Sequence, residues 1–196
     1  MLILYSHFKT RAIPVMLILF YSTIGFGQTD KKEHKDTSAI TVGFEIDALP
    51  FLMKGYYGSV WVGLNKQNLR LRPVYAKSNI PDFMLEEDIK RNTVNAFAFI
   101  ADYFFKDNFE GIWIGTGFEY WDNEIENNMG VSATYESWVY TLGGGYVWKF
   151  WGNMYLNPWI AGHIRTGGDS EISIGDAIYK PLSFTPEISL KLGWHF

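Results

Sequence analysis

The sequence predicts an all-β fold, an eight-stranded antiparallel β-barrel, from three observations. Aromatic side chains make up 18% of the 196 residues and there are 19 glycines, and strands favour aromatic residues. Eight segments alternate apolar and polar residues with period 2, which predicts strands with one apolar face. The links between these segments are short and long in turn, as in a sheet whose strands run up and down around a closed ring.

The first residues have the pattern of a secretory signal peptide, which we assign to residues 1–27. Lys9 and Arg11 supply a positive start, and an apolar run follows them. Gly25 and Gly27 are the small residues that a signal peptidase requires before its cleavage site. The ending Gly-Phe-Gly-Gln resembles the signal sequences of Bacteroidetes. We therefore expect the chain to be exported.

A membrane-anchoring helix is the alternative for this segment. A spanning helix needs roughly 20 apolar residues, and Pro14 interrupts the run well before that length. The polar segment 28–37 has the composition of a disordered linker. The barrel is then expected to occupy residues 38–196.

The last segment, 182–196, shows the alternation most clearly. Its apolar residues share one parity: Leu182, Phe184, Ile188, Leu190, Leu192, Trp194 and Phe196. This run is much longer than a usual strand of about five or six residues. A long strand with one continuous apolar face is what a transmembrane barrel requires.

Seven upstream segments repeat this pattern. In chain order they are 40–47, 59–65, 69–76, 96–105, 111–120, 137–149 and 153–165. The total of eight is even, as a closed antiparallel sheet with both ends on one side demands. The whole set therefore predicts a transmembrane barrel.

The links between the segments differ in length. Tight turns are expected at 65–68, 106–108 and 151–153. Longer links are expected at 78–92, 122–131 and 166–181, with an intermediate one at 49–54. Barrels of the outer membrane have short turns on the periplasmic side and long loops outside.

Three prolines are unexpected in a closed barrel. Pro73, Pro158 and Pro186 fall inside predicted strands, and a closed barrel offers no edge on which to place them. At Pro186 we expect a lost ladder bond or a bulge without a register shift, because the alternation is the same on both sides. The glycines at 143–145 predict a sharp bend or an aromatic ring lying over the backbone.

The chain resembles the small eight-stranded outer-membrane barrels of the OmpA, OmpX and OmpW kind, over about 38–196. The most specific match is the C-terminal Leu-Lys-Leu-Gly-Trp-His-Phe. The resemblance implies a monomer in the outer membrane of a Gram-negative bacterium, in contact with lipid and lipopolysaccharide. It also implies that the barrel-assembly machinery recognises Trp194 and Phe196 as an assembly signal. It implies the fold, and no particular function.

The lumen of such a barrel is just wide enough for its own side chains to fill. The parity points ten charged residues inward: Glu45, Asp47, Arg70, Arg72, Asp102, Glu119, Lys149, Arg165, Glu187 and Lys191. Buried charges persist only when they are paired, so we predict a salt-bridge network. Arg70, Arg72 and Asp102 should lie at similar depth, because each is close to a periplasmic turn. A transport or catalytic role for these charges is the alternative.

His163 is the one candidate catalytic residue. It is expected to face inward, level with Ser183 and Thr185 on the next strand and near Glu119. A histidine with a hydroxyl and a carboxylate is a hydrolase or acyltransferase constellation, and barrels that modify lipid A use such groups. The His-x-Ser motif of the lipid A deacylase family is absent, since isoleucine and arginine follow His163. A hydrogen-bonded lumen residue is therefore favoured over an enzyme.

Aromatic residues are expected to form two belts at the membrane interfaces. The outer belt is predicted to contain Tyr56, Trp121, Trp138 and Phe184. The inner belt is predicted to contain Tyr103, Trp148, Trp151 and Trp194.

Composition narrows the functions. The chain has no cysteine and no EF-hand spacing, so no metal or cofactor is expected. Its net charge of −4 without a basic block argues against nucleic acid. The long loops are acidic, which favours a structural or surface-interaction barrel with an unknown extracellular partner. The alternatives are a narrow channel or carrier of small apolar ligands, and a lipid-modifying enzyme that uses His163.

Overall fold

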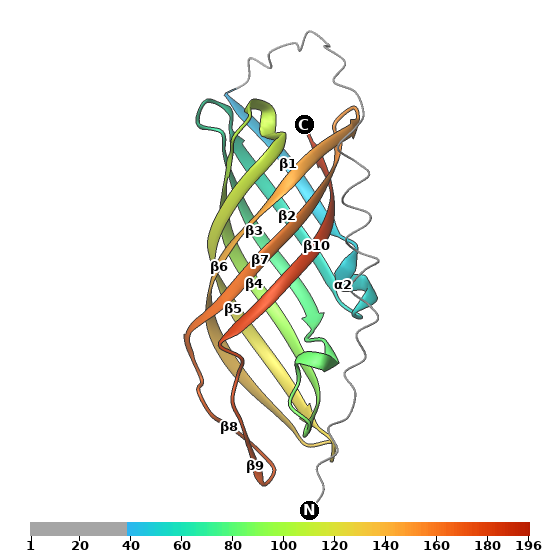
Figure 1. The fold of residues 1–196 in the computed structure, drawn as a ribbon, viewed down its shortest axis with the longest axis vertical. Coiled ribbons are helices and arrows are strands. Elements are labelled where there is room, and N and C mark those ends of the chain that lie inside the picture. Colours follow the sequence, from blue (N-terminus) through green and yellow to red (C-terminus); the bar gives the residue numbers. More distant parts are fainter. Residues whose placement is uncertain (1–38) are drawn as a thin grey trace, which may run out of the picture. The chain divides into compact units, whose positions relative to one another are not determined.

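The computed structural model describes residues 39–196, so the predicted signal peptide (1–27) and linker (28–37) lie outside the described residues. Within 39–196, eight strands form a closed antiparallel barrel, which confirms the predicted fold class (Figure 1). The strands are β1 (Ile40–Asp47), β2 (Tyr56–Leu64), β3 (Leu69–Asn79), β4 (Ile89–Phe104), β5 (Gly111–Asn127), β6 (Ser132–Trp151), β7 (Met154–Gly168) and β10 (Phe184–His195). Each pairs with the next, and β10 closes the ring on β1, with Phe44 opposite Trp194.

The connections are sorted between the two ends of the barrel (Figure 1). The end that carries the C-terminus has η1 (Asn65–Gln67), η3 (Asp107–Phe109) and the turn at Gly152. The other end, which we call the outer end, has α2 (Leu49–Leu52), η2 (Asp82–Met84) and a hairpin of β8 (Ile172–Ile174) and β9 (Ala177–Tyr179). Among residues 39–196 no helix is long and apolar enough to cross a membrane.

The predicted long link at 122–131 is wrong. Strands β5 and β6 stay paired as far as Glu126 and Ser132, so a tight turn at 128–131 joins them. Strand β4 likewise begins at Ile89 rather than at 96. The outward face of the β5 extension is polar, with Asp122, Glu124 and Glu126, so the usual alternation with apolar residues outward is lost there. Period 2 in hydrophobicity therefore fails to reveal these extensions.

Pro186 keeps the register, opposite Gly162 of β7. The expectation that the barrel offers no edge is wrong here. Strand β1 ends at Asp47. On its edge towards β1, strand β10 has backbone pairing only as far as Leu190. The outer half of β10 is thus a local edge, where a proline costs no bond to β1.

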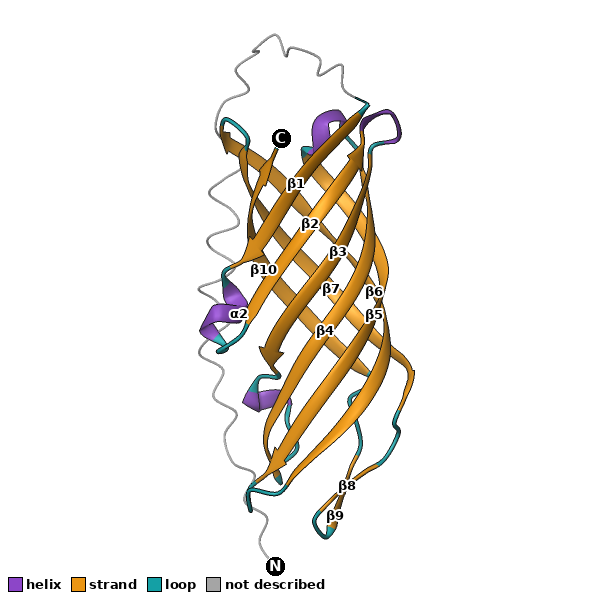
Figure 2. Cartoon of the chain, turned by 180° about the vertical axis from the view of Figure 1, so that it is seen from behind, coloured by secondary structure: helices purple, strands orange, loops and turns teal. Residues whose placement is uncertain are grey.

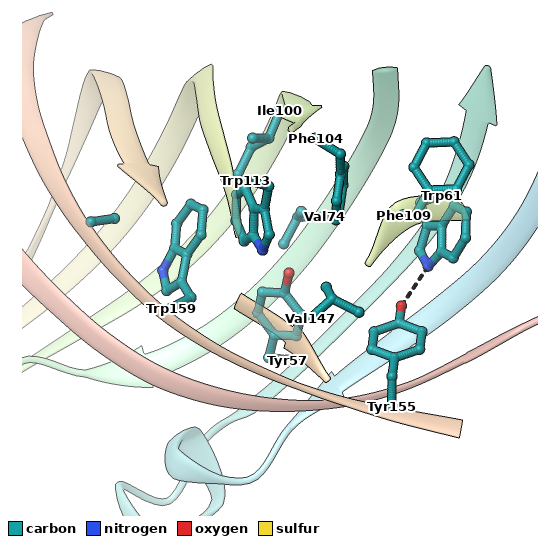
Figure 3. Close-up of a cluster of buried hydrophobic side chains, with 11 residues drawn as sticks. Tyr57, Trp61, Val74, Ile100, Phe104, Phe109, Trp113, Val147, Tyr155 and Trp159 are labelled. Carbon is teal, nitrogen blue, oxygen red and sulfur yellow. Dashed lines mark hydrogen bonds between the residues drawn. The ribbon is translucent and has the colours of Figure 1, made fainter. Parts of the chain in front are cut away.

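Glycines in the half of the barrel that carries the C-terminus make room for aromatic rings. A Cβ at Gly193 would lie 2.1 Å from Cζ of Tyr155, and one at Gly145 would lie 2.9 Å from the ring of Trp113. Figure 3 shows Tyr155 beside Trp61, whose indole nitrogen donates a 2.8 Å hydrogen bond to the Tyr155 hydroxyl. The expected ring over the backbone is therefore present at Gly145.

Replacing Gly193 by alanine should destabilise the barrel, because the Tyr155 ring must move to admit the methyl group. Overpacking of this kind typically costs about 1–3 kcal/mol of the free energy of unfolding. Gly58→Ala is the matched control, since a Cβ at Gly58 meets nothing within 4 Å. Urea titration of both variants in lipid vesicles, followed by tryptophan fluorescence, measures the difference. Equal stability of the two would contradict this packing.

Candidate functional site

A layer of four buried charges crosses the lumen. The side chains of Glu45, Arg70, Arg72 and Asp102 have at most 1% of their surface exposed. Asp102 Oδ2 lies 2.8 Å from Nε of Arg70 and 2.6 Å from Nε of Arg72. The Glu45 carboxylate lies 2.9 Å from Nη1 of Arg70 and 3.2 Å from Nη1 of Arg72. Two anions and two cations therefore form one neutral group, which we call the charge layer.

Strand geometry brings these four residues together. Arg70 and Arg72 share the inward parity of β3, and Asp102 is the ladder partner of Arg70 on β4. Glu45 comes from β1, on the far side of β2. Its neighbour on β2 is Ser59, whose small side chain lets the carboxylate reach the arginines. The charge layer thus draws on strands β1, β3 and β4.

Neutral donors complete the coordination of Glu45. Its Oε1 accepts hydrogen bonds from the Tyr155 hydroxyl at 3.1 Å and from Nδ2 of Asn157 at 2.9 Å. Asn157 in turn accepts a 3.0 Å bond from Nε1 of Trp113. Hydrogen bonds of this kind offset the cost of taking a carboxylate out of water.

Aromatic rings cover the cations of the lumen. The Arg70 guanidinium lies 5.0 Å from the ring centre of Phe104, and that of Arg72 lies 5.2 Å from the centre of Trp159. The Lys191 ammonium lies 4.1 Å from the centre of Trp159. Cation–π contacts are strengthened where water is absent. These aromatic residues share the parity of the inward charges, but the predicted lumen network did not include them.

His163 lies nearer the outer end, between two carboxylates. Its Nδ1 is 2.8 Å from Oγ1 of Thr141 and 3.3 Å from Glu119, and its Nε2 is 2.8 Å from Glu187. The hydroxyl at the ring therefore belongs to β6. The expected hydroxyls of Ser183 and Thr185 lie towards the opposite neighbour, β10, and form no contact of this kind.

Trp121 also belongs to this cluster. Its indole nitrogen donates a 2.7 Å bond to Glu119, and its ring lies 5.3 Å from that of His163. Its assignment to the outer aromatic belt is therefore wrong. Glu119 and Asn123, which lie two residues before and two residues after Trp121, both face inward, and Trp121 shares their parity.

The His163 cluster holds its ring in place rather than freeing it for chemistry. Both ring nitrogens already face oxygen atoms. Thr141, the neighbouring hydroxyl, is fully buried and donates its proton to Glu119 at 2.5 Å. A nucleophile needs access to substrate and a base with a free nitrogen. Thr141 is not accessible to a substrate, and His163 has no free ring nitrogen.

The remaining predicted residues are distributed along the lumen. Asp47 accepts hydrogen bonds from the Ser189 hydroxyl and, at 2.9 Å, from the amide of Leu49. Arg165 donates to Ser137 at 3.1 Å and to the carbonyl of Asp169 near the outer end. At the opposite end, Lys149 donates a 2.7 Å bond to the carbonyl of Asn108.

At the C-terminus, the Phe196 ring lies 6.4 Å from that of Phe44, the ladder partner of Trp194. Residues 39–196 contain no cluster of three or more histidine, aspartate or glutamate side chains arranged to hold a metal ion.

No model of a known protein family and no curated protein matches the chain. The solved structures that are similar to it include the following two. The N-terminal beta-barrel domain of Pseudomonas aeruginosa OprF has a TM-score of 0.53 and 14% identity, over 80% of this chain and 96% of that one. Neisserial surface protein A (NspA) has a TM-score of 0.49 and 14% identity, over 81% and 98%. At this identity the likeness to the OprF domain extends to the barrel fold alone.

Replacing Glu45 by glutamine should destabilise the barrel by about 3–5 kcal/mol, the usual effect of breaking a buried charge pair. The amide leaves two guanidinium groups with Asp102 as their one remaining acid in the charge layer. Glu126→Gln is the control, because Glu126 pairs with the exposed Lys90 and this change should have little effect. The free energies of unfolding of both variants in vesicles provide the test, and similar losses would argue against the charge layer.

Proposed function

We propose that the protein is an integral outer-membrane barrel of a Gram-negative bacterium that is closed to diffusing solutes and acts through its outer surface. A belt of apolar side chains around the barrel supports the membrane location. Their exposed fractions are 45% for Val42, 56% for Phe99, 67% for Phe118 and 63% for Ile160. In water such a surface would be unfavourable and prone to association.

The charge layer carries the proposal of a closed lumen. Glu45, Arg70, Arg72 and Asp102 are buried, so that water does not reach their atoms, which supports a filled cross-section. Trp61 and Tyr155 lie beside this layer towards the end that carries the C-terminus, and both are buried. A solute would have to break paired charges in order to pass, which argues against a channel.

A second apolar cluster supports a surface role. Its buried members come from β4, β5, β6 and the β8–β9 hairpin: Ile89, Ile125, Tyr135, Ile172, Ile174 and Tyr179. The cluster fixes the outer hairpins in one arrangement, which lowers the entropy lost when a partner binds.

Acidic side chains lie on the same outer hairpins and links. They are Asp82, Glu86, Glu87 and Asp88 between β3 and β4, Asp122, Glu124 and Glu126 on the outer part of β5, and Asp169, Glu171 and Asp176 between β7 and β10. We infer a partner with a basic surface. Carboxylate–amine cross-linking on intact cells would join these side chains to lysines of such a partner and identify it.

Two further contacts belong to the proposal. Lipid and lipopolysaccharide would surround the apolar belt. The barrel-assembly machinery would recognise the last strand through Trp194 and Phe196, which the resemblance implies. The arrangement around His163 favours a structural role over lipid-modifying catalysis, because both ring nitrogens are engaged.

Leu190→Arg should destabilise the folded barrel by about 2–4 kcal/mol if this strand spans a bilayer. Leu190 faces outward, six residues before Phe196. At about 3.3 Å per residue and a tilt near 40°, it lies roughly 15 Å from the inner interface, close to the midplane. Trp194→Arg, on the same face near the interface, should cost about 1 kcal/mol or less from lipid exposure. Equal costs, or a harmless Leu190→Arg, would refute the membrane assignment.

In planar lipid bilayers the barrel should give no stepwise conductance, because the charge layer leaves no continuous water path. A water-filled porin inserted under the same conditions is the positive control. Folding of the added barrel is checked by the shift between heated and unheated samples on gels. Reproducible conductance steps from the inserted barrel would overturn the closed lumen.

A further inference from the structure

A cavity of about 370 Å³ lies in the outer half of the lumen, beyond the charge layer. Lys191 and Trp159 lie at the end of the cavity nearest the charge layer. One wall is almost entirely apolar and comes from β3 and β4. Its residues are Val74, Ala76, Val94, Ala96, Ala98 and Ile100. Cavities of this size and character are typical of sites for small apolar ligands.

The polar groups of the opposite wall are engaged with one another. Glu119 and Glu187 hold His163 between them, with contacts of 3.3 and 2.8 Å. Asp47 accepts the Ser189 hydroxyl and the Leu49 amide. A charged ligand would have to displace these contacts or the rings of Tyr57 and Trp159 that cover the Lys191 ammonium. An apolar ligand needs only the β3–β4 wall. The cavity therefore favours an uncharged, apolar occupant.

The cavity opens sideways through the barrel wall. Residues 185–189 of β10 all line it, including Ile188, which faces outward and is 56% exposed. Inward and outward residues border one cavity only where the wall has a gap. The gap occurs where β1 ends, and Leu49, Pro50 and Met53 form its other side. Figure 2 shows β3 to β7 continuing past the level at which β1 and β2 end beside α2.

The surroundings of the gap are apolar. Phe51 and Leu52 of α2 are 59% and 81% exposed, and Ile188 borders the opposite side. Ile188 is eight residues from Phe196, which places it about 20 Å from the inner interface, within an apolar band about 25 Å tall. The outer end of the cavity is lined by Ile80 and by Phe83 and Met84 of η2. The gap thus faces the outer leaflet.

We propose that this cavity takes up an acyl chain of a membrane lipid, which enters through the gap between β10 and α2 while its head group stays at the interface. The proposal rests on the membrane location proposed above. Pro186 fits this role, because it adds no backbone N–H to the edge of the gap. An acyl chain is already out of water in the bilayer, so its entry depends on packing contacts with the apolar wall that compete with those of the bilayer.

The test is photo-crosslinking of the full protein, reconstituted in vesicles that contain a phosphatidylcholine with a diazirine near the end of one acyl chain. Mass spectrometry locates the adducts on β4. Ala96 and Ala98 line the cavity, whereas Phe97 and Phe99 face outward on the same strand. Outward adducts report contact with the bilayer, and inward adducts report entry of a chain.

Ala98→Phe fills the cavity and should lose the inward adducts while keeping the outward ones. Ala101→Phe places the same ring on the outward face of β4 and should keep both. The shift between heated and unheated samples on gels verifies that each variant is folded. A parallel sample with free diazirine fatty acid and unlabelled phosphatidylcholine distinguishes the source of the chain.

Inward adducts from the phospholipid that disappear in Ala98→Phe alone would support the proposal. Outward adducts without inward ones would overturn it and leave the membrane location standing. Inward adducts from the free fatty acid only would overturn the lipid source. Absence of all adducts would contradict both the membrane location and the acyl-chain site.

Discussion

The burial of four charges in a narrow barrel is the constraint on which the other features depend. A lone carboxylate or guanidinium group in this position would cost several kcal/mol in lost hydration. Asp102 and Glu45 each bridge Arg70 and Arg72, so that every charge faces two of the opposite sign. The coordination holds only if β1, β3 and β4 keep their register. The charge layer therefore ties strands on either side of β2 to one another.

The charge layer also separates the lumen into two parts. Towards the end that carries the C-terminus, Trp61, Phe109 and Tyr155 pack against glycines that leave room for their rings. Towards the outer end the contacts become sparser, and a cavity lies between the β3–β4 wall and the His163 cluster. Barrels of eight strands are generally filled by their own side chains. Small residues on β3 and β4, such as Ala76 and Ala98, leave this half unfilled.

Period 2 was sufficient to predict the ring of strands, the inward charges and the common depth of Arg70, Arg72 and Asp102, because membrane-type strands repeat one simple pattern. It was insufficient where the outward face of a strand is polar, as in the extension of β5 and β6, whose apolar residues Ile125 and Tyr135 face inward. Which hydroxyl meets His163 depends on the stagger between β6 and β7, and no local pattern contains that information. The edge at Pro186 follows from the short β1, a property of a different segment. Trp121 was assigned to the outer aromatic belt, although it has the same parity as the inward residues Glu119 and Asn123.

A double-mutant cycle between Arg72 and Asp102 tests the central role of the charge layer most directly. The four proteins are the wild type, Arg72→Met, Asp102→Leu and the double variant, compared by their free energies of unfolding in lipid vesicles. Each single change removes one of the two partners of a buried charge and leaves the charge layer with a net charge, so it should cost about 3–5 kcal/mol. The double variant removes both charges, and its loss should be smaller than the sum by about 2 kcal/mol or more. Additive losses would show that the two side chains do not stabilise each other, and would contradict the account.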